Sequence, residues 1–398
     1  MNYAQVDMVF AIKSAVHALK SYCFQKIMES ICQFRNYFGD SLQGKNIRRI
    51  LIVQMANIGD AVLSTPIISA LANKYHHAEI HVLTGSENKD IFNNNPNIVR
   101  VIRYDSNKYI RHKNGSNKIA FLSKFIKNEA YDVVIIIRAD FWFLSYLIFG
   151  HYSKIALYHI KHHPQRRMWL QYLGIIDIEK ELIPHNVEII FNSLKKIHIR
   201  LDDRLDHKSI FPISESYRID AANVLRTEGI KSDFVVFHIN TPFKYRNWPI
   251  DRFIALIDHV TTIWGLQCIL VGGSKDEICN RIVLTNCKDS KMIRSVVGRI
   301  DLNVTAAIIE KAKVYVGNDS GPMHIAAAMG TPVLAFFGPQ IPALFHPWLT
   351  KSRILYNNRA CSPCWQRNCV TPEAYCMMDI SIEQAMIAFD DLMKEVNV

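Results

Sequence analysis

The sequence predicts an α/β protein with two doubly wound domains and an additional helical segment at its N-terminus. From Arg48 onward, short runs rich in aliphatic and β-branched residues alternate with helical patterns. This alternation is typical of parallel strands whose crossover helices cover both faces of a sheet. The pattern occurs twice within 398 residues, a length that favours two or three domains.

Residues 1–45 form the first predicted element. Apolar residues recur there at steps of three or four between Val6 and Phe38, and Lys13 and Lys20 lie off that stripe. The spacing predicts one long amphipathic helix or two successive ones. Its apolar face would pack on the body of the protein or on a second subunit; the alternative is a helix lying on an anionic membrane.

The first predicted domain spans residues 46–205. A polar, highly charged stretch, residues 200–216, follows the last helical pattern of this half and indicates the hinge. The strands predicted before it are Arg49–Gln54, Glu79–Thr84, Val99–Tyr104 and Asp132–Arg138, with helices near 61–74 and 117–128.

The second predicted domain spans residues 206–378. In open parallel sheets, ligands bind beyond the carboxyl ends of the strands, so the chemistry is expected in the loops that follow them. The predicted strands are Phe234–Ile239, Gln267–Gly272, Ile293–Val297, Lys313–Val316, Val333–Phe337 and Arg353–Tyr356.

Composition excludes several classes of protein. With 49% hydrophobic and 21% charged residues, the chain resembles an ordinary soluble protein. The net charge of +11 favours anionic partners such as nucleotides or a phospholipid surface, and no recognisable nucleic-acid module accompanies it. The most apolar window, Val133–Phe149, is interrupted by Arg138 and Asp140, which argues against a membrane-spanning helix. The absence of a signal-peptide pattern and the odd cysteine number, nine, predict a cytoplasmic protein.

The first candidate motif follows the strand Arg49–Gln54 and contains Gly59 and Asp60. Gly59 is expected to permit the turn into the next helix. Asp60 at the helix start could cap that helix and complement its dipole. Alternatively, a fixed carboxylate at a strand end can act as a general base toward an attacking hydroxyl.

The second motif, residues 314–332, is a strand, a polar loop with Asn318, Asp319 and Ser320, and a helix rich in small residues that begins near Gly321. Free N–H groups at such a helix start suit a diphosphate. Asp319 and Ser320 could instead simply cap the helix, and His324 could be an interior histidine with a satisfied hydrogen bond.

The third motif is a basic loop after the strand Phe234–Ile239. Lys244 and Arg246 are placed to neutralise charge on a departing diphosphate, and Trp248 beside them suggests an anchored loop rather than a solvated one.

The chain has no Gly-x-Gly-x-x-Gly after its first strand and no Walker Gly-Lys-Ser/Thr motif. These absences argue against a nicotinamide dehydrogenase and a P-loop ATPase.

Together, the three motifs resemble family 9 glycosyltransferases, the lipopolysaccharide heptosyltransferases and their relatives. The resemblance covers roughly residues 48–395 and depends on motif order as well as motif content. The matching segments are Ile58-Gly59-Asp60, His185-Asn-Val187, Arg246-Asn-Trp-Pro249, Gly317–His324, Gly330-Thr-Pro332 and Phe337-Gly-Pro339.

The resemblance implies a GT-B fold, in which two Rossmann-like domains face a cleft, the first binding the acceptor and the second the sugar nucleotide. It implies that residues 379–398 form a helix that packs back on the first domain. It also implies a metal-independent, inverting transfer of a heptose or similar sugar, with ADP-heptose as the expected donor and a lipopolysaccharide core or other surface glycan as the acceptor. The enzyme would then work in the cytoplasm, peripherally on the inner membrane.

The resemblance further implies roles for single residues. Asp60 matches the catalytic base, and Arg246 stands where the family usually has Lys. Ser320 replaces a commoner Thr, and Gln340 stands where the family often has Thr. Gly59 belongs to the acceptor side, and the donor-binding residues would be Lys244, Asn318, Asp319, Ser320, Gly321, His324 and Gly338.

Two other functions fit the same architecture. A sugar-nucleotide epimerase would convert the donor without an acceptor, and a non-catalytic sugar-nucleotide-binding partner would have no turnover. Fold alone cannot separate these functions.

Four of the nine cysteines lie within sixteen residues: Cys361, Cys364, Cys369 and Cys376. Four thiolates so close in sequence could hold a structural zinc or iron ion, although their spacing is shorter than in common zinc ribbons. Reduced thiols or disulfides are the alternatives.

Overall fold

The computed structural model describes residue 30 and residues 46–104, 129–138, 154–157, 184–195, 199, 201, 207–364 and 369–397. These residues form two compact units. Unit 1 contains the described residues up to Asn57 and from Pro66 to His207, and unit 2 contains Ile58–Thr65 and the residues from Lys208 onward. The predicted N-terminal helical segment, apart from Ser30, and the helix predicted near 117–128 lie outside the described residues.

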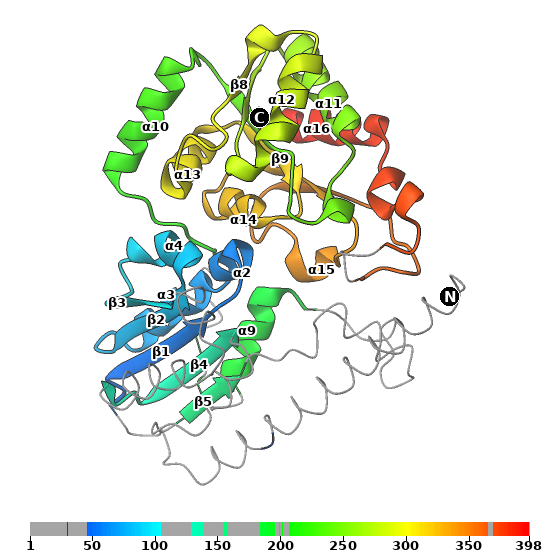
Figure 1. The fold of residues 1–398 in the computed structure, drawn as a ribbon. Helices are drawn as coiled ribbons and strands as arrows, with labels where there is room; N and C mark the ends of the chain where they lie inside the picture. The colour runs from blue at the N-terminus through cyan, green and yellow to red at the C-terminus, as the bar shows by residue number, and fades with distance from the viewer. Residues whose placement is uncertain are drawn as a thin grey trace, which may run out of the picture. The chain divides into compact units, whose positions relative to one another are not determined.

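Unit 1 is built on a five-stranded sheet of order β3-β2-β1-β4-β5, in which every pair of neighbours is parallel (Figure 1). The core strand β1 is buried from Ile50 to Gln54 because both faces of a doubly wound sheet are covered. The elements are β1 (Arg49–Gln54), α3 (Thr65–Lys74), β2 (Glu79–Gly85), η1 (Ser86–Asn88), α4 (Lys89–Asn93), β3 (Arg100–Tyr104), β4 (Val133–Arg138), β5 (Lys154–Leu157) and α9 (Asn186–Lys195).

Unit 2 carries a six-stranded parallel sheet of order β11-β10-β9-β6-β7-β8. Its strands are β6 (Phe234–His238), β7 (Gln267–Leu270), β8 (Ile293–Ser295), β9 (Val314–Asn318), β10 (Val333–Phe337) and β11 (Ser352–Tyr356). Its helices are α2 (Ile58–Leu63), α10 (Glu215–Thr227), η3 (Lys244–Arg246), α11 (Ile250–Ile263), η4 (Ser274–Asp276), α12 (Glu277–Asn286), η5 (Ser290–Met292), α13 (Leu302–Lys311), α14 (Gly321–Ala328), α15 (Pro342–Phe345), η6 (Pro372–Ala374), η7 (Cys376–Asp379) and α16 (Ile382–Val396).

The helices of unit 2 form two groups. Helix α10 packs on α13 and α13 on α14, whereas α11 packs on α12 and α16 (Figure 1). Two parallel sheets with helices packed on them confirm the predicted α/β, doubly wound fold. Strand β5 is a difference from the prediction, because Lys154–Leu157 is short and lies in a basic, histidine-rich stretch that lacks a strand pattern.

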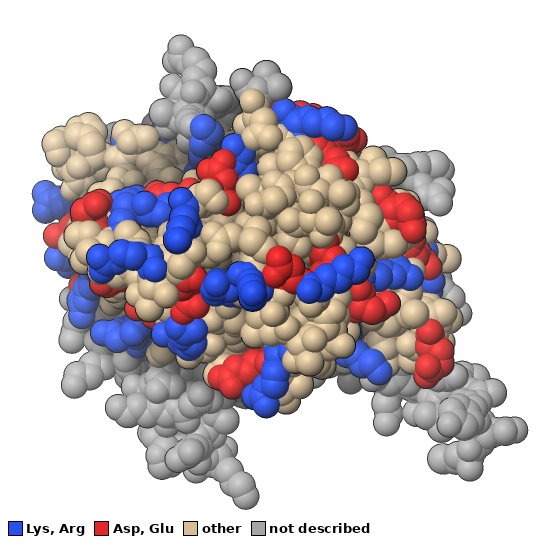
Figure 2. All heavy atoms as spheres, turned by 90° about the horizontal axis from the view of Figure 1, so that it is seen from above, with Lys and Arg blue, Asp and Glu red and all other residues tan. Residues whose placement is uncertain are grey.

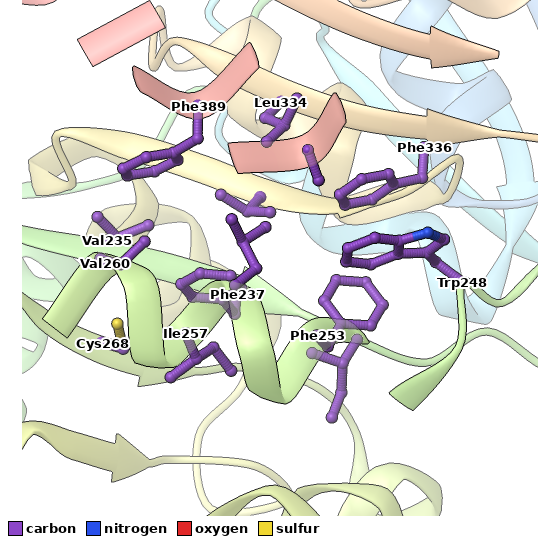
Figure 3. Packing of buried hydrophobic residues seen from close by; sticks show 14 of the residues in the cluster. Val235, Phe237, Trp248, Phe253, Ile257, Val260, Cys268, Leu334, Phe336 and Phe389 are labelled. Carbon is purple, nitrogen blue, oxygen red and sulfur yellow. The ribbon is translucent and has the colours of Figure 1, made fainter. Parts of the chain in front are cut away.

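The core of unit 2 centres on Trp248, whose indole stacks on Phe336 at 4.2 Å between ring centroids and meets Phe253 edge-on at 5.0 Å (Figure 3). Helix α16 contributes Phe389 to the same cluster. The buried face of α16 is therefore occupied by unit 2, which corrects the expectation that residues 379–398 pack back on the first domain. An amphipathic stripe reveals an apolar face but not its partner.

Candidate active site

The strand β9 and the helix α14 bring the second motif together. Ser320 stands at the N-cap position of α14, yet its side chain makes no capping hydrogen bond. Its Oγ lies 3.3 Å from Nδ1 of His238 at the end of β6. The capping role considered for Ser320 is therefore not observed, and the Ser320 side chain leaves the first N–H groups of α14 uncapped.

Arg246 of the basic loop forms an ion pair with Asp319. Its Nε and Nη2 both donate to Oδ2 of Asp319, at 3.1 and 2.5 Å. The side chains are 19% and 1% exposed, so this pair is partly shielded from water. A guanidinium has five N–H donors, and those not used here have no hydrogen-bond partner in the described part of the chain, although the guanidinium lies 5.9 Å from the Phe243 ring centroid. Arg246 can therefore bind a second anion while it stays paired.

The carboxyl group of Asp319 also interacts electrostatically with Asp60. Burial raises the pKa of the Asp319 carboxyl above its usual range, the positive charge of Arg246 opposes that shift, and the negative charge of Asp60 adds to it. Oδ1 of Asp319 is buried without a hydrogen-bond partner among the described residues. The structure thus brings Asp60, Arg246 and Asp319 into one electrostatic cluster, although they are far apart in sequence.

Asp60 lies half-buried in the first turn of α2, as the sequence predicts. Gly59 precedes it, with a helical backbone rather than a turn, which corrects the role expected for this glycine. A Cβ on Gly59 would come within 2.6 Å of Cδ2 of His324, and a Cβ on Gly321 within 2.9 Å of Cγ2 of Ile58. The two glycines let α2 and α14 pack closely together.

His324 is buried beneath this contact and uncharged. Burial lowers its pKa to about 3, and the positive charges of Arg246 and His346 contribute to the shift. Its Nδ1 has no hydrogen-bond partner among the described residues. His324 therefore offers a neutral imidazole next to Gly59 and Gly321, rather than an interior histidine with a satisfied hydrogen bond.

The basic loop is anchored, as Trp248 predicted. The indole N–H of Trp248 donates to the Ile380 carbonyl at 2.9 Å, and its backbone N–H donates to Oδ1 of Asn318 at the same distance. Asn318 also donates through Nδ2 to the Ile239 carbonyl at 3.1 Å. Asn318, expected to bind the donor, thus fixes the loop that carries Arg246.

A hydrogen-bond network that the sequence analysis missed supports the same loops. Asn247 donates to Oδ1 of Asn240 at 3.0 Å, and Asn240 donates to Oδ1 of Asp276 at 2.7 Å. Oδ2 of Asp276 lies 3.9 Å from Nε2 of His238. Burial lowers the pKa of His238. In the sequence, this network could be recognised only as short polar residues that follow strands. Such residues are also common in solvated loops, so they do not by themselves predict a network.

Lys244 and Gly338 take other positions. Lys244 is exposed, and its Nζ lies 5.4 Å from the Tyr245 ring centroid. A Cβ on Gly338 would come within 2.4 Å of Sδ of Met377, so Gly338 is packed against η7. In the part of the chain that the structure describes, neither residue forms a hydrogen bond or ion pair with the side chains of Arg246 and Asp319.

None of the four clustered cysteines is in a disulfide bond. Burial and the neighbouring thiols raise the pKa of Cys376 to about 12, which keeps it protonated near neutral pH. Within the described ranges, no group of three or more His, Cys, Asp or Glu side chains is arranged to hold a metal ion. The predicted zinc or iron site therefore gains no support.

Comparison with known proteins identifies the family. The model of glycosyltransferase family 9 (heptosyltransferase) matches residues 119–375, more than half of the chain. The chain belongs to glycosyltransferase family 9. This confirms the predicted resemblance and makes the protein a glycosyltransferase by family. The match includes the basic loop, the Asp319–Gly321 loop and His324.

Individual family 9 relatives agree. Lipopolysaccharide heptosyltransferase 3 of Escherichia coli K12 is 27% identical over 298 residues, which cover 73% of this chain and 82% of that protein. The solved family 9 glycosyltransferase of Veillonella parvula aligns with a TM-score of 0.69 at 19% identity, over 88% of this chain and all of that one. ADP-heptose lipopolysaccharide heptosyltransferase II of E. coli aligns with a TM-score of 0.66, also at 19% identity and over the same shares. These neighbours support the GT-B fold of the family.

Among its described helices, this family 9 chain has none that is both long and apolar enough to cross a bilayer.

Proposed function

We propose that this family 9 enzyme is an inverting heptosyltransferase that transfers heptose from ADP-heptose to a lipopolysaccharide core. The names of its relatives support this donor and acceptor, since one is an ADP-heptose lipopolysaccharide heptosyltransferase and another a lipopolysaccharide heptosyltransferase. The cluster of Asp60, Arg246 and Asp319 supports the chemistry.

In this proposal, Asp60 is the general base. Its carboxylate would take the proton from an acceptor hydroxyl as the hydroxyl oxygen attacks the anomeric carbon of the donor from the face opposite the nucleotide. The new glycosidic bond forms as the bond to the diphosphate breaks, so the anomeric configuration inverts. Gly59 keeps α2 close to α14, which places Asp60 near the Asp319 loop.

The leaving diphosphate would bind at the start of α14. Arg246 would supply positive charge through its remaining N–H groups, and the first backbone N–H groups of α14, near Ser320 and Gly321, would donate to the diphosphate oxygens. Lys244, on the same short helix, would assist when the donor is bound. The proposed reaction assigns no step to a metal ion, because these groups meet the developing negative charge.

The remaining donor contacts are proposed from the same loops. Asp319 holds Arg246, His324 presents a neutral ring, Asn318 fixes the loop, and Gly338 borders the loop after β10. Residues 46–205 would bind the acceptor, and residues 206–378 the sugar nucleotide. The protein would act in the cytoplasm, peripherally on an anionic inner-membrane surface.

The membrane contact is proposed from the net charge of +11 and the predicted amphipathic segment at residues 1–45. On the face drawn in Figure 2, the described Lys and Arg side chains alternate with Asp and Glu. That face therefore presents no purely basic patch, and the proposed membrane contact rests on the predicted N-terminal segment.

One observation carries the proposal: the Arg246–Asp319 ion pair lies just before α14, and Asp60 interacts electrostatically with Asp319. The test is incubation of the purified protein with ADP-heptose and a heptose-deficient lipopolysaccharide core, with ADP release and acceptor mass as readouts. We expect ADP and an acceptor heavier by one heptose, with inverted configuration at the new linkage. Donor conversion without acceptor would indicate an epimerase, and ADP binding without turnover a non-catalytic partner.

A further inference from the structure

A group of buried polar side chains in unit 1 holds the segment that leads to Asp60. Gln54, Thr84 and Asn88 are each fully buried. Asn88 precedes α4, but its side chain does not cap that helix. Its Nδ2 donates instead to the carbonyl oxygen of Ala56, a residue of the loop between β1 and α2. Nothing in the proposed chemistry uses Asn88 directly.

The same loop residue is held on its other side. The backbone N–H of Ala56 donates to Oε1 of Gln54 at 3.1 Å. The backbone carbonyl of Gln54 in turn accepts from Oγ1 of Thr84 at 2.7 Å, and the N–H of Met55 donates to the Arg138 carbonyl at 3.0 Å. Both backbone polar groups of Ala56 are therefore bonded to buried side chains.

The end of β1 is irregular where this bonding occurs. The register between β1 and β4 shifts between Val53 and Gln54, whereas the pairing of β1 with β2 stays regular through Gln54. Such irregularities redirect a chain next to functional sites. Just before α2, the chain is therefore held by the side chains of Gln54 and Asn88 at Ala56 and by the backbone bond from Met55 to Arg138.

We propose that Asn88 is a positioning residue for Asp60: with Gln54, it fixes the Ala56 backbone four residues before the base. This inference rests on the proposed function of Asp60. A general base must lie within hydrogen-bond reach of the hydroxyl that it deprotonates, and a displacement of about 1 Å can lower the rate about 10²-fold. Asn88 supplies the only side-chain donor to the Ala56 carbonyl in the described part of the chain.

The first test is the isosteric substitution Asn88→Asp, which replaces the donor with a second oxygen. We expect kcat to fall about 10- to 100-fold, with the KM for donor and the affinity for ADP within threefold of wild type. Asn95→Asp is the matched control. Asn95 is buried beyond the other end of α4, where its Oδ1 accepts from the Asn97 N–H at 3.0 Å and its Nδ2 has no hydrogen-bond partner among the described residues. This control should retain near-normal kcat.

A double-substitution cycle separates positioning from general loss of structure. If Asn88 acts through Asp60, Asn88→Asp should change the residual rate of Asp60→Asn by less than threefold. Equal losses in both backgrounds, or an unchanged kcat in folded Asn88→Asp, would overturn the inference. Where Asn88→Asp does not fold, Asn88→Ala removes the same donor without burying charge and is subject to the same criteria. Near-normal turnover of Asp60→Asn alone would instead refute the proposed base.

Discussion

At the scale of single residues, Arg246 has both a structural role and a proposed chemical role. It donates twice to one oxygen of Asp319, and its other N–H groups, which have no hydrogen-bond partner among the described residues, can bind an anion. An uncompensated carboxylate would be left buried if the guanidinium were removed. Arg246 therefore both satisfies Asp319 and presents positive charge at the start of α14.

We expect Arg246→Ala to lower kcat/KM by about 10²- to 10³-fold, the usual cost of losing a group that stabilises transition-state charge. Arg246→Lys should retain more activity, because an ammonium keeps the charge but not the planar fork. Steady-state kinetics with ADP-heptose measures both. Arg281→Ala, on the exposed surface of α12, is the control. Arg246→Ala with a kcat/KM near that of this control would exclude the assigned role.

His324 gives a prediction for the pH dependence of stability. Its pKa is about 3 in the folded protein and about 6.5 when unfolded. Between these values the unfolded chain binds a proton that the folded one does not, so stability is fully present above pH 6.5 and falls as the pH decreases toward 3. In this window, the free energy of unfolding of wild type should fall with each unit of decreasing pH by about 1.4 kcal/mol more than that of His324→Gln. Urea titrations at several pH values measure both. Parallel curves for the two proteins would contradict the buried, neutral imidazole.

At the scale of elements, the packing of α2 on α14 depends on two glycines. Gly59→Ala would push a methyl group into the His324 ring, and Gly321→Ala would push one into Ile58. Each should lower the free energy of unfolding by about 1–3 kcal/mol, the usual cost of overpacking, and should lower kcat. Gly273→Ala is the control, because a Cβ there meets nothing within 4 Å. Thermal unfolding compares the three, and a control as unstable as Gly59→Ala would remove the packing argument.

The elements differ in how far the sequence predicts them. Strands such as β1 and β10 are continuous apolar runs between polar loops, so their bounds follow almost directly from the residues. The four-residue β5 has no such pattern. Helix α16 was predicted as a helix but assigned to the wrong domain, because the residues that cover its apolar face, such as Val235 and Leu334, are distant in sequence.

The candidate site was predictable as motifs but not as contacts. Motif order placed Asp60, Arg246 and Asp319 at strand ends, where parallel sheets bind ligands. The pairing of Arg246 with Asp319, and the contact of Gly59 with His324, depend on tertiary packing between segments far apart in the chain. The Asn88–Ala56 bond was missed for the same reason, since an asparagine before a short helix is usually a cap.

At the scale of the whole molecule, the division into two units makes donor binding separable from the rest of the fold. Every residue proposed to bind the diphosphate lies in unit 2, together with Asp60. A ligand that binds only the folded protein at about 100 times its dissociation constant adds about 2.7 kcal/mol of stability. ADP should therefore stabilise unit 2 selectively.

Thermal unfolding of the full chain with ADP, UDP, GDP and CDP in turn tests this expectation. For a unit of roughly 200 residues, the added stability corresponds to a rise of about 5–10 °C in the transition of unit 2. Arg246→Ala should reduce that rise, because it removes the charge that the diphosphate would meet. A selective shift with UDP, GDP or CDP would retain the transferase but replace the donor. No shift with any of them would contradict a nucleotide site at the start of α14.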